Sequence, residues 1–376
     1  MIIRKVDIWH LKLPFRYPFK HNLATYAGSE NLLVKVTAHD GSVGYGEGVP
    51  RTFVTGESLP EALNFLTGSL APQILGTSWA SPAELIHKGT MVPPDPETER
   101  FPAARCALEM ALLDVAGRSR GKSLSELLGG PVHGRVQYSA VIPLEVPEKL
   151  PRLLQLVKEK RMRHLKLKVG GAHDRQLLGL ARKELGWQVD IRVDANGAWT
   201  AEEAVGRLKE MLPFGISAVE QPVAKEDYEG LQWVSRSLEI PVMADESLCT
   251  ETDARRLIEM QACRLFNLRI SKCGGLLAAA RIRDLAKEAG IACQLGCHVG
   301  ETSILAAAGR HFALCSPGMV YVEGSFAPYL LAQDPVHQPV TFHAEGIGLP
   351  LPGPGLGVTV REDLLADLAV SHVSLS

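Results

Sequence analysis

Residues 163–170 read RHLKLKVG, a short stretch that alternates apolar and basic side chains. This two-residue period is typical of a β-strand, which places successive side chains on opposite faces. Similar apolar strands follow at regular distances: VDIRVD (189–194), GISAVE (215–220) and IPVMAD (240–245). Successive strand ends from Lys168 to Arg269 are 26, 26, 25 and 24 residues apart. This near-constant period predicts repeated βα units.

The repeat predicts a (β/α) barrel. Eight candidate strands end near Val141, Lys168, Asp194, Glu220, Asp245, Arg269, Gln294 and Glu323. Amphipathic segments such as TAEEAVGRLKEML (200–212) and ETDARRLIEM (251–260) fill the gaps between strands as helices. Eight βα units need about 200 residues, and the region from 131 to 344 is long enough to hold them. The alternative is an open doubly wound sheet, but no G-x-G-x-x-G turn stands where a nucleotide would need one.

The residues before the barrel have a different pattern. MIIRKVDIWHLKL (1–13) and NLLVKVTAHDGSVGYGEGV (31–49) alternate like strands, with a turn at Asp40 and Gly41. ARCALEMALLDVAGRSR (104–120) has apolar residues at helical spacing, and SLSELLGG (123–130) is a short helix closed by glycines. We therefore expect an α+β domain over residues 1–130.

Composition narrows the class of protein. The 376 residues carry a net charge of −2, with 46% hydrophobic and 22% charged residues. These values are typical of a globular protein and do not suggest a nucleic-acid partner. No apolar run approaches the roughly 18 residues of a membrane span, and no signal peptide precedes the first strand. The seven cysteines form no C-x-x-C pair, so we expect reduced thiols and a cytoplasmic protein.

Three acids close three consecutive strands, and barrel active sites lie at this end of the strands. They are Asp194, Glu220 and Asp245. Any one of them alone is explained as a solvated strand end or a helix cap. Three carboxylates that converge repel one another unless a cation lies between them. All-oxygen ligation suits a hard dication, so the pattern predicts a Mg²⁺ site, which Mn²⁺ could also fill.

Two lysines, Lys166 and Lys168, share one face of the strand that precedes Asp194. Either this strand lies at an edge, with solvated ammonium groups, or both lysines point into a site that needs positive charge. A nearby dication and a second ammonium disfavour the protonated form of Lys168. A lysine whose pKa is lowered in this way can act as a base near neutral pH.

Together these segments resemble the enolase superfamily, specifically its muconate-lactonising-enzyme subgroup. The resemblance covers nearly the whole chain through CALEMALLDVAGRSRGKSLSELLGG (106–130), LKLKVG (165–170), VDANGAW (193–199), VEQPV (219–223), ADES (244–247), NLRISKCGG (267–275) and PGLGV (354–358). It implies a (β/α)7β modified TIM barrel over residues 131–344, under a capping domain of residues 1–130 completed by residues 345–376. It also implies a homo-oligomer, Mg²⁺ at the three acids, Lys168 as base and Lys166 as its electrostatic helper.

The chain departs from the subgroup on the sixth barrel strand, where the family usually has a second catalytic lysine. The matching residue is Arg269, which stays protonated and is a poor base. It is expected to bind a carboxylate or stabilise an anion, or else to be a structural partner of Asp245. His298, in LGCHVGETS (295–303), is the candidate second base, with a packing or loop histidine as the alternative.

The remaining candidates are expected to contact substrate. They lie in the two capping loops, after the strands and in the loop that carries His298: Tyr26, Arg51, Thr52, Phe53, Asn196, Glu301 and Glu323. Each of the capping-loop residues also fits an ordinary loop role. Dipeptide epimerases of the family carry D-x-D after strand eight. VEGSFAPYL (322–330) lacks that motif, which disfavours a dipeptide substrate.

The expected function is Mg²⁺-dependent abstraction of the proton α to the carboxylate of a small molecule. Because Arg269 replaces one base, β-elimination (dehydration) or cycloisomerisation is favoured as the following step. A racemase or epimerase that uses His298 as its second base is the first alternative. A non-catalytic metal-dependent binding homologue is the second, although such a protein has no chemical need for Lys168.

Overall fold

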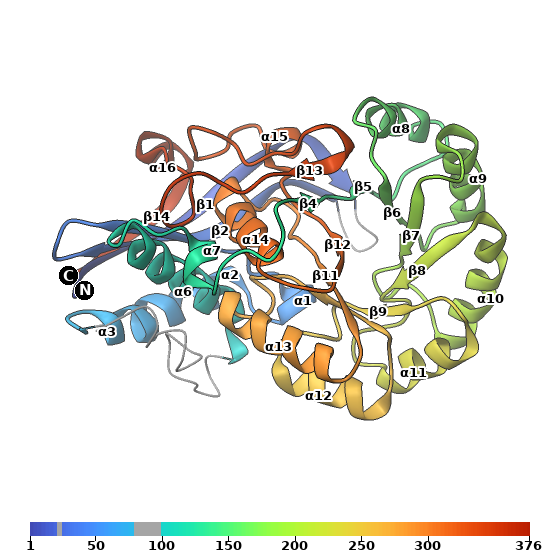
Figure 1. The fold of residues 1–376 in the computed structure, drawn as a ribbon, viewed down its shortest axis with the longest axis horizontal. Helices are drawn as coiled ribbons and strands as arrows, with labels where there is room; N and C mark the ends of the chain where they lie inside the picture. Colours follow the sequence, from blue (N-terminus) through green and yellow to red (C-terminus); the bar gives the residue numbers. More distant parts are fainter. Residues whose placement is uncertain (21–24, 79–98) are drawn as a thin grey trace.

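The computed structural model describes residues 1–20, 25–78 and 99–376 (Figure 1). An antiparallel sheet and its helices form one part of the molecule, and a parallel barrel forms the other. The two termini lie close together at the far end of the antiparallel sheet, because the last strand pairs with the first. Within the described residues, no helix is both long and apolar enough to cross a bilayer.

The capping sheet has four strands in the order β14-β1-β2-β3. Their bounds are β1 (Ile3–Lys20), β2 (Thr25–Ala38), β3 (Val43–Gly48) and β14 (Ala369–Leu375). The turn between β2 and β3 contains Gly41 with φ of 86°, a left-handed conformation that glycine adopts without steric cost. The expected strands and turn of this region are therefore present, and the C-terminal strand joins them.

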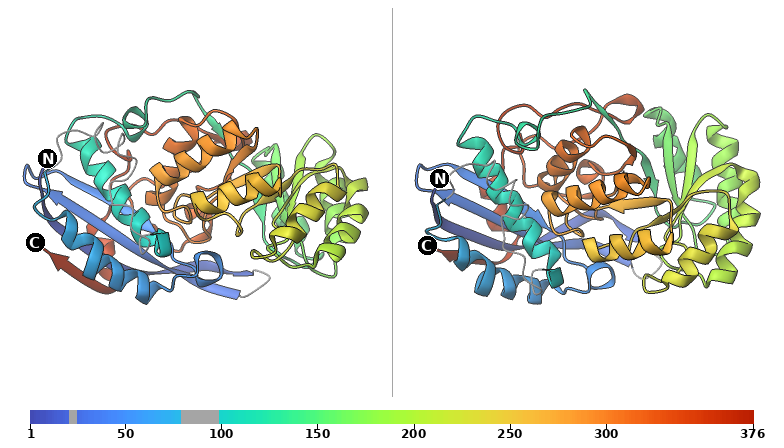
Figure 2. Two further views of the ribbon diagram at one scale, coloured as in Figure 1. Left: turned by 90° about the horizontal axis from the view of Figure 1, so that it is seen from below. Right: turned by 60° about the horizontal axis from the view of Figure 1, so that its bottom comes forward.

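Helix α6 (Pro102–Arg118) packs across this sheet, as both views in Figure 2 show. Three glycines of β3, Gly44, Gly46 and Gly48, face the helix backbone. A Cβ atom on Gly46 would lie 2.0 Å from the carbonyl oxygen of Ala107, so only glycine permits this close approach. Because both sides of α6 are covered, its residues from Pro102 to Gly117 are all buried.

Shorter elements complete this part of the molecule. They are α1 (Thr52–Thr55), α2 (Leu59–Phe65), the π-helical turn η1 (Leu66–Leu70), α3 (Ala71–Ile74), α7 (Leu124–Leu127), α16 (Glu362–Leu368) and the two-stranded pair β4 (Val136–Gln137) and β13 (Ile347–Gly348). Helix α7 begins at a capping box formed by Ser123 and Glu126. Gly129 and Gly130 follow it with positive φ, as the sequence predicts for its end.

The barrel has eight parallel strands in consecutive order. They are β5 (Ala140–Ile142), β6 (His164–Lys168), β7 (Asp190–Asp194), β8 (Ile216–Glu220), β9 (Val242–Ala244), β10 (Leu265–Leu268), β11 (Ala292–Leu295) and β12 (Met319–Val322). The Ser139 N–H donates to the carbonyl of Val322 at 2.8 Å, which brings β12 back to the start of β5. Every strand end lies within one residue of its predicted position, and the open doubly wound alternative is excluded.

A helix connects each strand to the next. These are α8 (Leu150–Glu159), α9 (Asp174–Leu185), α10 (Ala201–Met211), α11 (Tyr228–Ser237), α12 (Glu251–Met260), α13 (Leu276–Glu288) and α14 (Ser303–Leu314). Short turns η2 (Leu212–Phe214), α15 (Ala327–Leu330) and η3 (Ala344–Gly346) lie in the loops. Thr200 and Thr250 begin α10 and α12 with capping boxes. Over residues 131–344, all of which are described, the architecture is therefore (β/α)7β.

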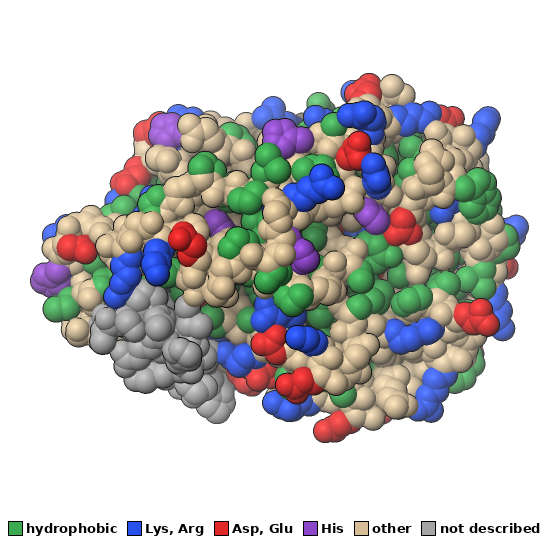
Figure 3. Space-filling view, in the orientation of Figure 1, with side chains coloured by type: hydrophobic (Ala, Val, Ile, Leu, Met, Phe, Trp, Pro, Cys, Tyr) green, Lys and Arg blue, Asp and Glu red, His purple; other side chains and the backbone are tan. Residues whose placement is uncertain are grey.

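The face shown in Figure 3 carries basic and acidic side chains interspersed with one another. This mixture agrees with a net charge close to zero. The strong clustering of charge lies inside the barrel instead, where several lysines, arginines and carboxylates are buried. Buried charges are costly unless they are paired, so this interior is the place to look for function.

Candidate active site

The position of strand β6 shows whether its two lysines are exposed to solvent. It lies within the barrel, with β5 on one side and β7 on the other. Leu165 and Leu167 are fully buried on the outer face, while Lys166 and Lys168 are also buried, with 3% and 7% of their surfaces exposed. Both faces of a barrel strand are covered, so the lysines point into the barrel and the edge-strand explanation is excluded.

Lys166 lies among carboxylates. Its Nζ is 3.1 Å from Glu220 Oε1, 3.2 Å from Asp194 Oδ2 and 2.8 Å from Glu323 Oε2. Burial by itself would lower the pKa of Lys166, but these carboxylates together raise it above its ordinary value. Lys166 is therefore a permanent cation in this arrangement, which is the property expected of an electrostatic helper.

Lys168 lies at the carboxyl end of β6, two residues after Lys166. Its Nζ donates to Asp194 Oδ2 at 2.6 Å and to Asn196 Oδ1 at 2.5 Å. Asn196 has φ of 46°, and its backbone N–H donates to Asp194 Oδ1 at 3.0 Å. The turn after β7 thus holds Asn196 against the lysine. Lys168, Lys166 and Asn196 all line one pocket beneath the cap.

The three predicted metal ligands lie at the ends of β7, β8 and directly after β9, and all are fully buried. Glu220 Oε1 accepts from Asn267 Nδ2 at 2.8 Å, and Glu220 Oε2 accepts from Gln294 Nε2 at 3.1 Å. Burial opposes ionisation of Asp194, but Lys168 and Lys166 hold its pKa below its ordinary range. Asp194 is therefore an anion, and all three side chains are held in place by the barrel wall.

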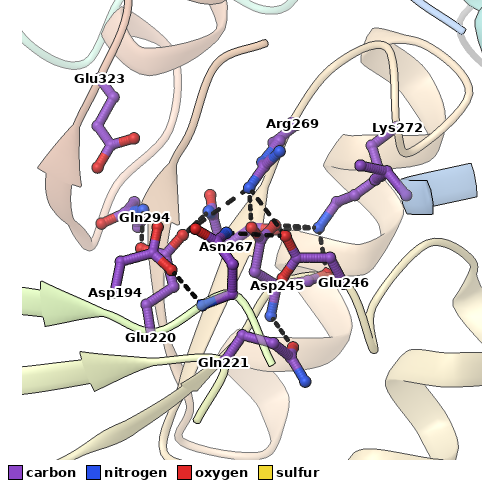
Figure 4. Close-up of polar contacts among 12 residues, drawn as sticks. Asp194, Glu220, Gln221, Asp245, Glu246, Asn267, Arg269, Lys272, Gln294 and Glu323 are labelled. Atoms are coloured by element: carbon purple, nitrogen blue, oxygen red, sulfur yellow. Dashed lines mark hydrogen bonds and ion pairs between the residues drawn. The ribbon is translucent and has the colours of Figure 1, made fainter. Parts of the chain in front are cut away.

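Arg269 follows β10 and points toward the carboxylates (Figure 4). Its Nη2 contacts Asp245 Oδ2 and lies 3.9 Å from Glu220 Oε1 and 3.8 Å from Glu246 Oε1. The other oxygen of Asp245 accepts from Lys272 Nζ at 2.9 Å. The structural pairing of Arg269 with Asp245, which the sequence left as an alternative, is thus present. Arg269 also lines the pocket, so the pairing does not remove it from reach of a ligand.

The donor set fits a hard dication in its chemistry. Carboxylate oxygens from three adjacent strand ends are buried together, and the guanidinium of Arg269 already lies beside Asp245 and Glu220 as a cation would. Within residues 1–20, 25–78 and 99–376, however, no three acidic, histidine or cysteine side chains are arranged to hold a metal as they lie. Lys166, Lys168 and Arg269 lie between the carboxylates, so a metal would require some of these cations to move.

His298 and Glu301 lie in the loop between β11 and α14. The His298 backbone N–H donates to Glu301 Oε2 at 3.0 Å. Burial, together with the charges of Arg269 and Arg51, lowers the pKa of His298 well below its ordinary value, so the imidazole is neutral. Among the described residues its Nε2 has no hydrogen-bond partner. His298 lines the pocket, whereas Glu301 lines a smaller neighbouring cavity, and Glu323 lines both.

The pocket lies between the barrel and the cap. Its empty volume is about 680 Å³, part of which is open to solvent. Its cap side carries Tyr26 and Phe53, whose rings stack with centroids 6.3 Å apart. Arg51 also lines the pocket, but its guanidinium is held by the carbonyls of Glu30, Pro50 and Val299. Thr52, the first residue of α1, does not line this pocket. Most of the predicted substrate contacts therefore converge, and Thr52 and Glu301 do not.

Sequence reasoning missed several polar residues of this interior. Arg192 contacts Glu323 and donates to Ser139 Oγ at 3.1 Å, while Glu246 accepts from Asn196 Nδ2 at 3.1 Å. Asn267 and Gln294 hold Glu220, and Lys272 holds Asp245. A signal was available for two of them, because Arg192 and Asn267 stand two positions before a predicted site residue. In a strand, such residues share one face.

Two family models match the chain. The Mandelate racemase / muconate lactonizing enzyme N-terminal domain matches residues 3–129, and the Enolase C-terminal domain-like model matches residues 149–364. The chain belongs to the mandelate racemase/muconate lactonising enzyme family of the enolase superfamily, as its strand-end motifs indicated. It is an isomerase or lyase of that superfamily.

Relatives of known activity align over nearly the full length. Muconate cycloisomerase 1 from Rhodococcus opacus is 32% identical over 371 residues, with 96% of each chain covered. The crystal structure of N-succinyl Arg/Lys racemase from Bacillus cereus superposes with a TM-score of 0.90 at 27% identity over all of both chains. A dipeptide epimerase from Cytophaga hutchinsonii, complexed with Mg and the dipeptide D-Ala-L-Val, gives 0.88 at 28%, also over all of both chains.

Proposed function

We propose that this enzyme removes the proton α to the carboxylate of a small-molecule substrate, with Mg²⁺ as its cofactor. Asp194, Glu220 and Asp245 would hold the ion. When bound, Mg²⁺ neutralises the substrate carboxylate and the negative charge that develops as the proton leaves. Lys168 takes the proton at its Nζ, and Lys166 remains a fixed cation beside the site.

The observation that carries this proposal is the position of Lys168. Its Nζ lies against Asp194 and the side chain lines the pocket, so a substrate in the pocket lies beside both the base and the carboxylate cluster. A structural lysine would need only the ion pair. The relative from Cytophaga hutchinsonii, complexed with Mg and a dipeptide, supports both the metal and the class of small-molecule ligand.

For the step that follows, we favour β-elimination or cycloisomerisation. Arg269 lines the wall of the pocket but is a poor base, since a guanidinium stays protonated near neutral pH. It would instead stabilise negative charge on the substrate or bind a second anionic group. One face of the α-carbon then has a base, and the other has a guanidinium that does not accept a proton.

The pocket also constrains the substrate. Phe15, Phe19, Tyr26 and Phe53 line its cap side, which favours an apolar or aromatic group. Glu323 is the one acid among the described lining residues, and its carboxylate is engaged by Arg192 and Lys166. A free amine on the substrate would find no unpaired carboxylate there. The proposed substrate is therefore a carboxylic acid that carries an apolar group and no free amine near β12.

The test is α-proton exchange in D₂O with a library of such acids and Mg²⁺. The wild-type protein should incorporate deuterium, whereas Lys168→Ala should lose at least about 10²-fold in rate, because general-base catalysis contributes this much or more. Lys209→Ala, at an exposed residue of α10, is the matched control and should exchange at the wild-type rate. Exchange by Lys168→Ala at the wild-type rate would remove Lys168 from the mechanism.

A second candidate is racemisation or epimerisation with His298 as the other base. Two observations favour it: His298 is neutral and lines the same pocket as Lys168, and the superposing relatives are named as a racemase and an epimerase. The two candidates differ in stereochemistry. If both enantiomers of a substrate exchange at comparable rates, and His298→Asn silences one of them, the one-base proposal is wrong.

A further inference from the structure

Arg269 lies where three carboxylates approach one another. A single atom of its guanidinium, Nη2, contacts Asp245 and lies within 4 Å of carboxylate oxygens of Glu220 and Glu246. Figure 4 shows the guanidinium above these side chains, on the side from which Lys272 also approaches Asp245. The barrel therefore supplies a cation of its own to the carboxylates proposed to bind Mg²⁺.

Each proposed metal ligand already faces a protein cation. Lys168 bonds to Asp194, Lys166 bonds to Glu220, and both oxygens of Asp245 are used, one by Arg269 and one by Lys272. A Mg²⁺ ion needs a carboxylate lone pair directed at it, at about 2.1 Å. The oxygen of Asp245 that Arg269 contacts cannot serve both cations from the same direction. One of the protein cations must therefore leave when a metal binds.

Arg269 is the cation that is least firmly held. Lys272 is fully buried and also donates to the backbone carbonyls of Asp245 and Asn267, at 2.5 and 2.9 Å. Lys166 has three carboxylate partners within 3.2 Å, whereas Glu220 and Glu246 are 3.9 and 3.8 Å from Arg269. The Arg269 side chain is 11% exposed toward the pocket, and within the described part of the chain its Nε has no hydrogen-bond partner. The least costly movement is therefore rotation of Arg269 into the pocket.

We propose that Arg269 and the divalent cation compete for Asp245, so that Mg²⁺ binds only as Arg269 withdraws into the pocket. This inference rests on the proposed Mg²⁺ site and goes beyond it, because it assigns a second role to Arg269. The displaced guanidinium would then lie on the pocket wall, where a substrate carboxylate gives it a new partner.

The first test measures Mg²⁺ affinity by calorimetry in the absence of substrate. Arg269→Met removes the charge, and Arg269→Lys keeps the charge on a shorter side chain without the planar fork that reaches Asp245. Competition through contact predicts that both variants bind Mg²⁺ at least about 10-fold more tightly than wild type, which corresponds to 1.4 kcal/mol. If Arg269→Lys binds like wild type and only Arg269→Met is tighter, simple charge repulsion explains the result and the proposal is wrong.

The second test follows the arginine directly. In protein labelled with ¹⁵N-arginine, the Nε–H signal of Arg269 is the one that Arg269→Lys lacks. It should shift as Mg²⁺ is added, with the same midpoint as the calorimetric titration. A stationary signal during Mg²⁺ binding would overturn the proposal.

Asp194→Asn separates this inference from the metal site itself. If wild type binds Mg²⁺, Asp194→Asn weakens that binding, and the Arg269 variants change nothing, then only the competition fails. If wild type and both Arg269 variants bind no Mg²⁺, or Asp194→Asn leaves binding unaltered, then the proposed metal site fails and the competition fails with it.

Discussion

Glu47 joins the cap to the barrel through hydrogen bonds, and its substitution by glutamine tests how much these bonds contribute to stability. This carboxylate at the end of β3 is fully buried beside the start of α14. Oε1 accepts from Asn31 Nδ2 at 2.6 Å and from Thr302 N at 2.9 Å. Oε2 accepts from Thr302 Oγ1 at 2.6 Å and from Leu305 N at 3.0 Å. All four partners are donors, so each oxygen must act as an acceptor.

Glutamine keeps one acceptor and places an NH₂ group where the other oxygen was. In one orientation the NH₂ faces Leu305 N, and in the other it faces Asn31 Nδ2 and Thr302 N. A buried N–H left without an acceptor costs about 1–3 kcal/mol. Glu47→Gln should therefore lower the free energy of unfolding by about 1–3 kcal/mol.

The assay is thermal unfolding followed by circular dichroism at pH 8, where the carboxylate is ionised although burial raises the pKa of Glu47 to about 7. With about 2.1 cal/mol/K per residue, 376 residues unfold with an entropy of about 0.8 kcal/mol/K, so the midpoint should fall by about 1–4 °C. Glu239→Gln, at an exposed position before β9, is the control and should shift the midpoint by less than about 1 °C, because a surface substitution changes stability by about 0.5 kcal/mol or less. Equal midpoints for Glu47→Gln and wild type would refute the reasoning.

Two further predictions concern stability. Gly46→Ala should yield little folded protein, because its Cβ would lie 2.0 Å from Ala107 O, whereas Gly68→Ala, with open space around it in a helical turn, should be neutral or stabilising by about 0.5–1 kcal/mol. Equal yields and midpoints for both variants would contradict this. Burial lowers the pKa of His311 to about 4. As the pH falls from 6.5 to 4, the unfolded chain therefore takes up the proton before the folded protein does. The free energy of unfolding should fall by up to about 3 kcal/mol over this range. Denaturant titrations across this range should show that the free energy of unfolding falls less with decreasing pH in His311→Gln than in wild type or in the exposed control His39→Gln. The same pH dependence in all three proteins would contradict this prediction.

The barrel could be predicted from the sequence because its signals are local. Each strand is a short apolar run, each run ends at a polar residue, and the intervals between ends are nearly constant. These features place Lys166 and Lys168 on one strand and Asp194, Glu220 and Asp245 at the ends of three others without reference to any long-range contact. The glycines of β3 carry a similar local signal, since three of them alternate in VGYGEG.

The partners of these residues were decided by the tertiary structure. Glu47 and Thr302 are 255 residues apart in the chain, and Arg192 and Glu323 are 131 apart. Such pairs meet only because the barrel closes and the cap covers one end of it. Burial, which lowers the pKa of His298, likewise depends on the cap and loops packed around the imidazole. The sequence determined the strand positions of the two lysines and the three acids, and only the closed barrel decided which charged groups pair, because ion pairs depend on distances that local patterns do not encode.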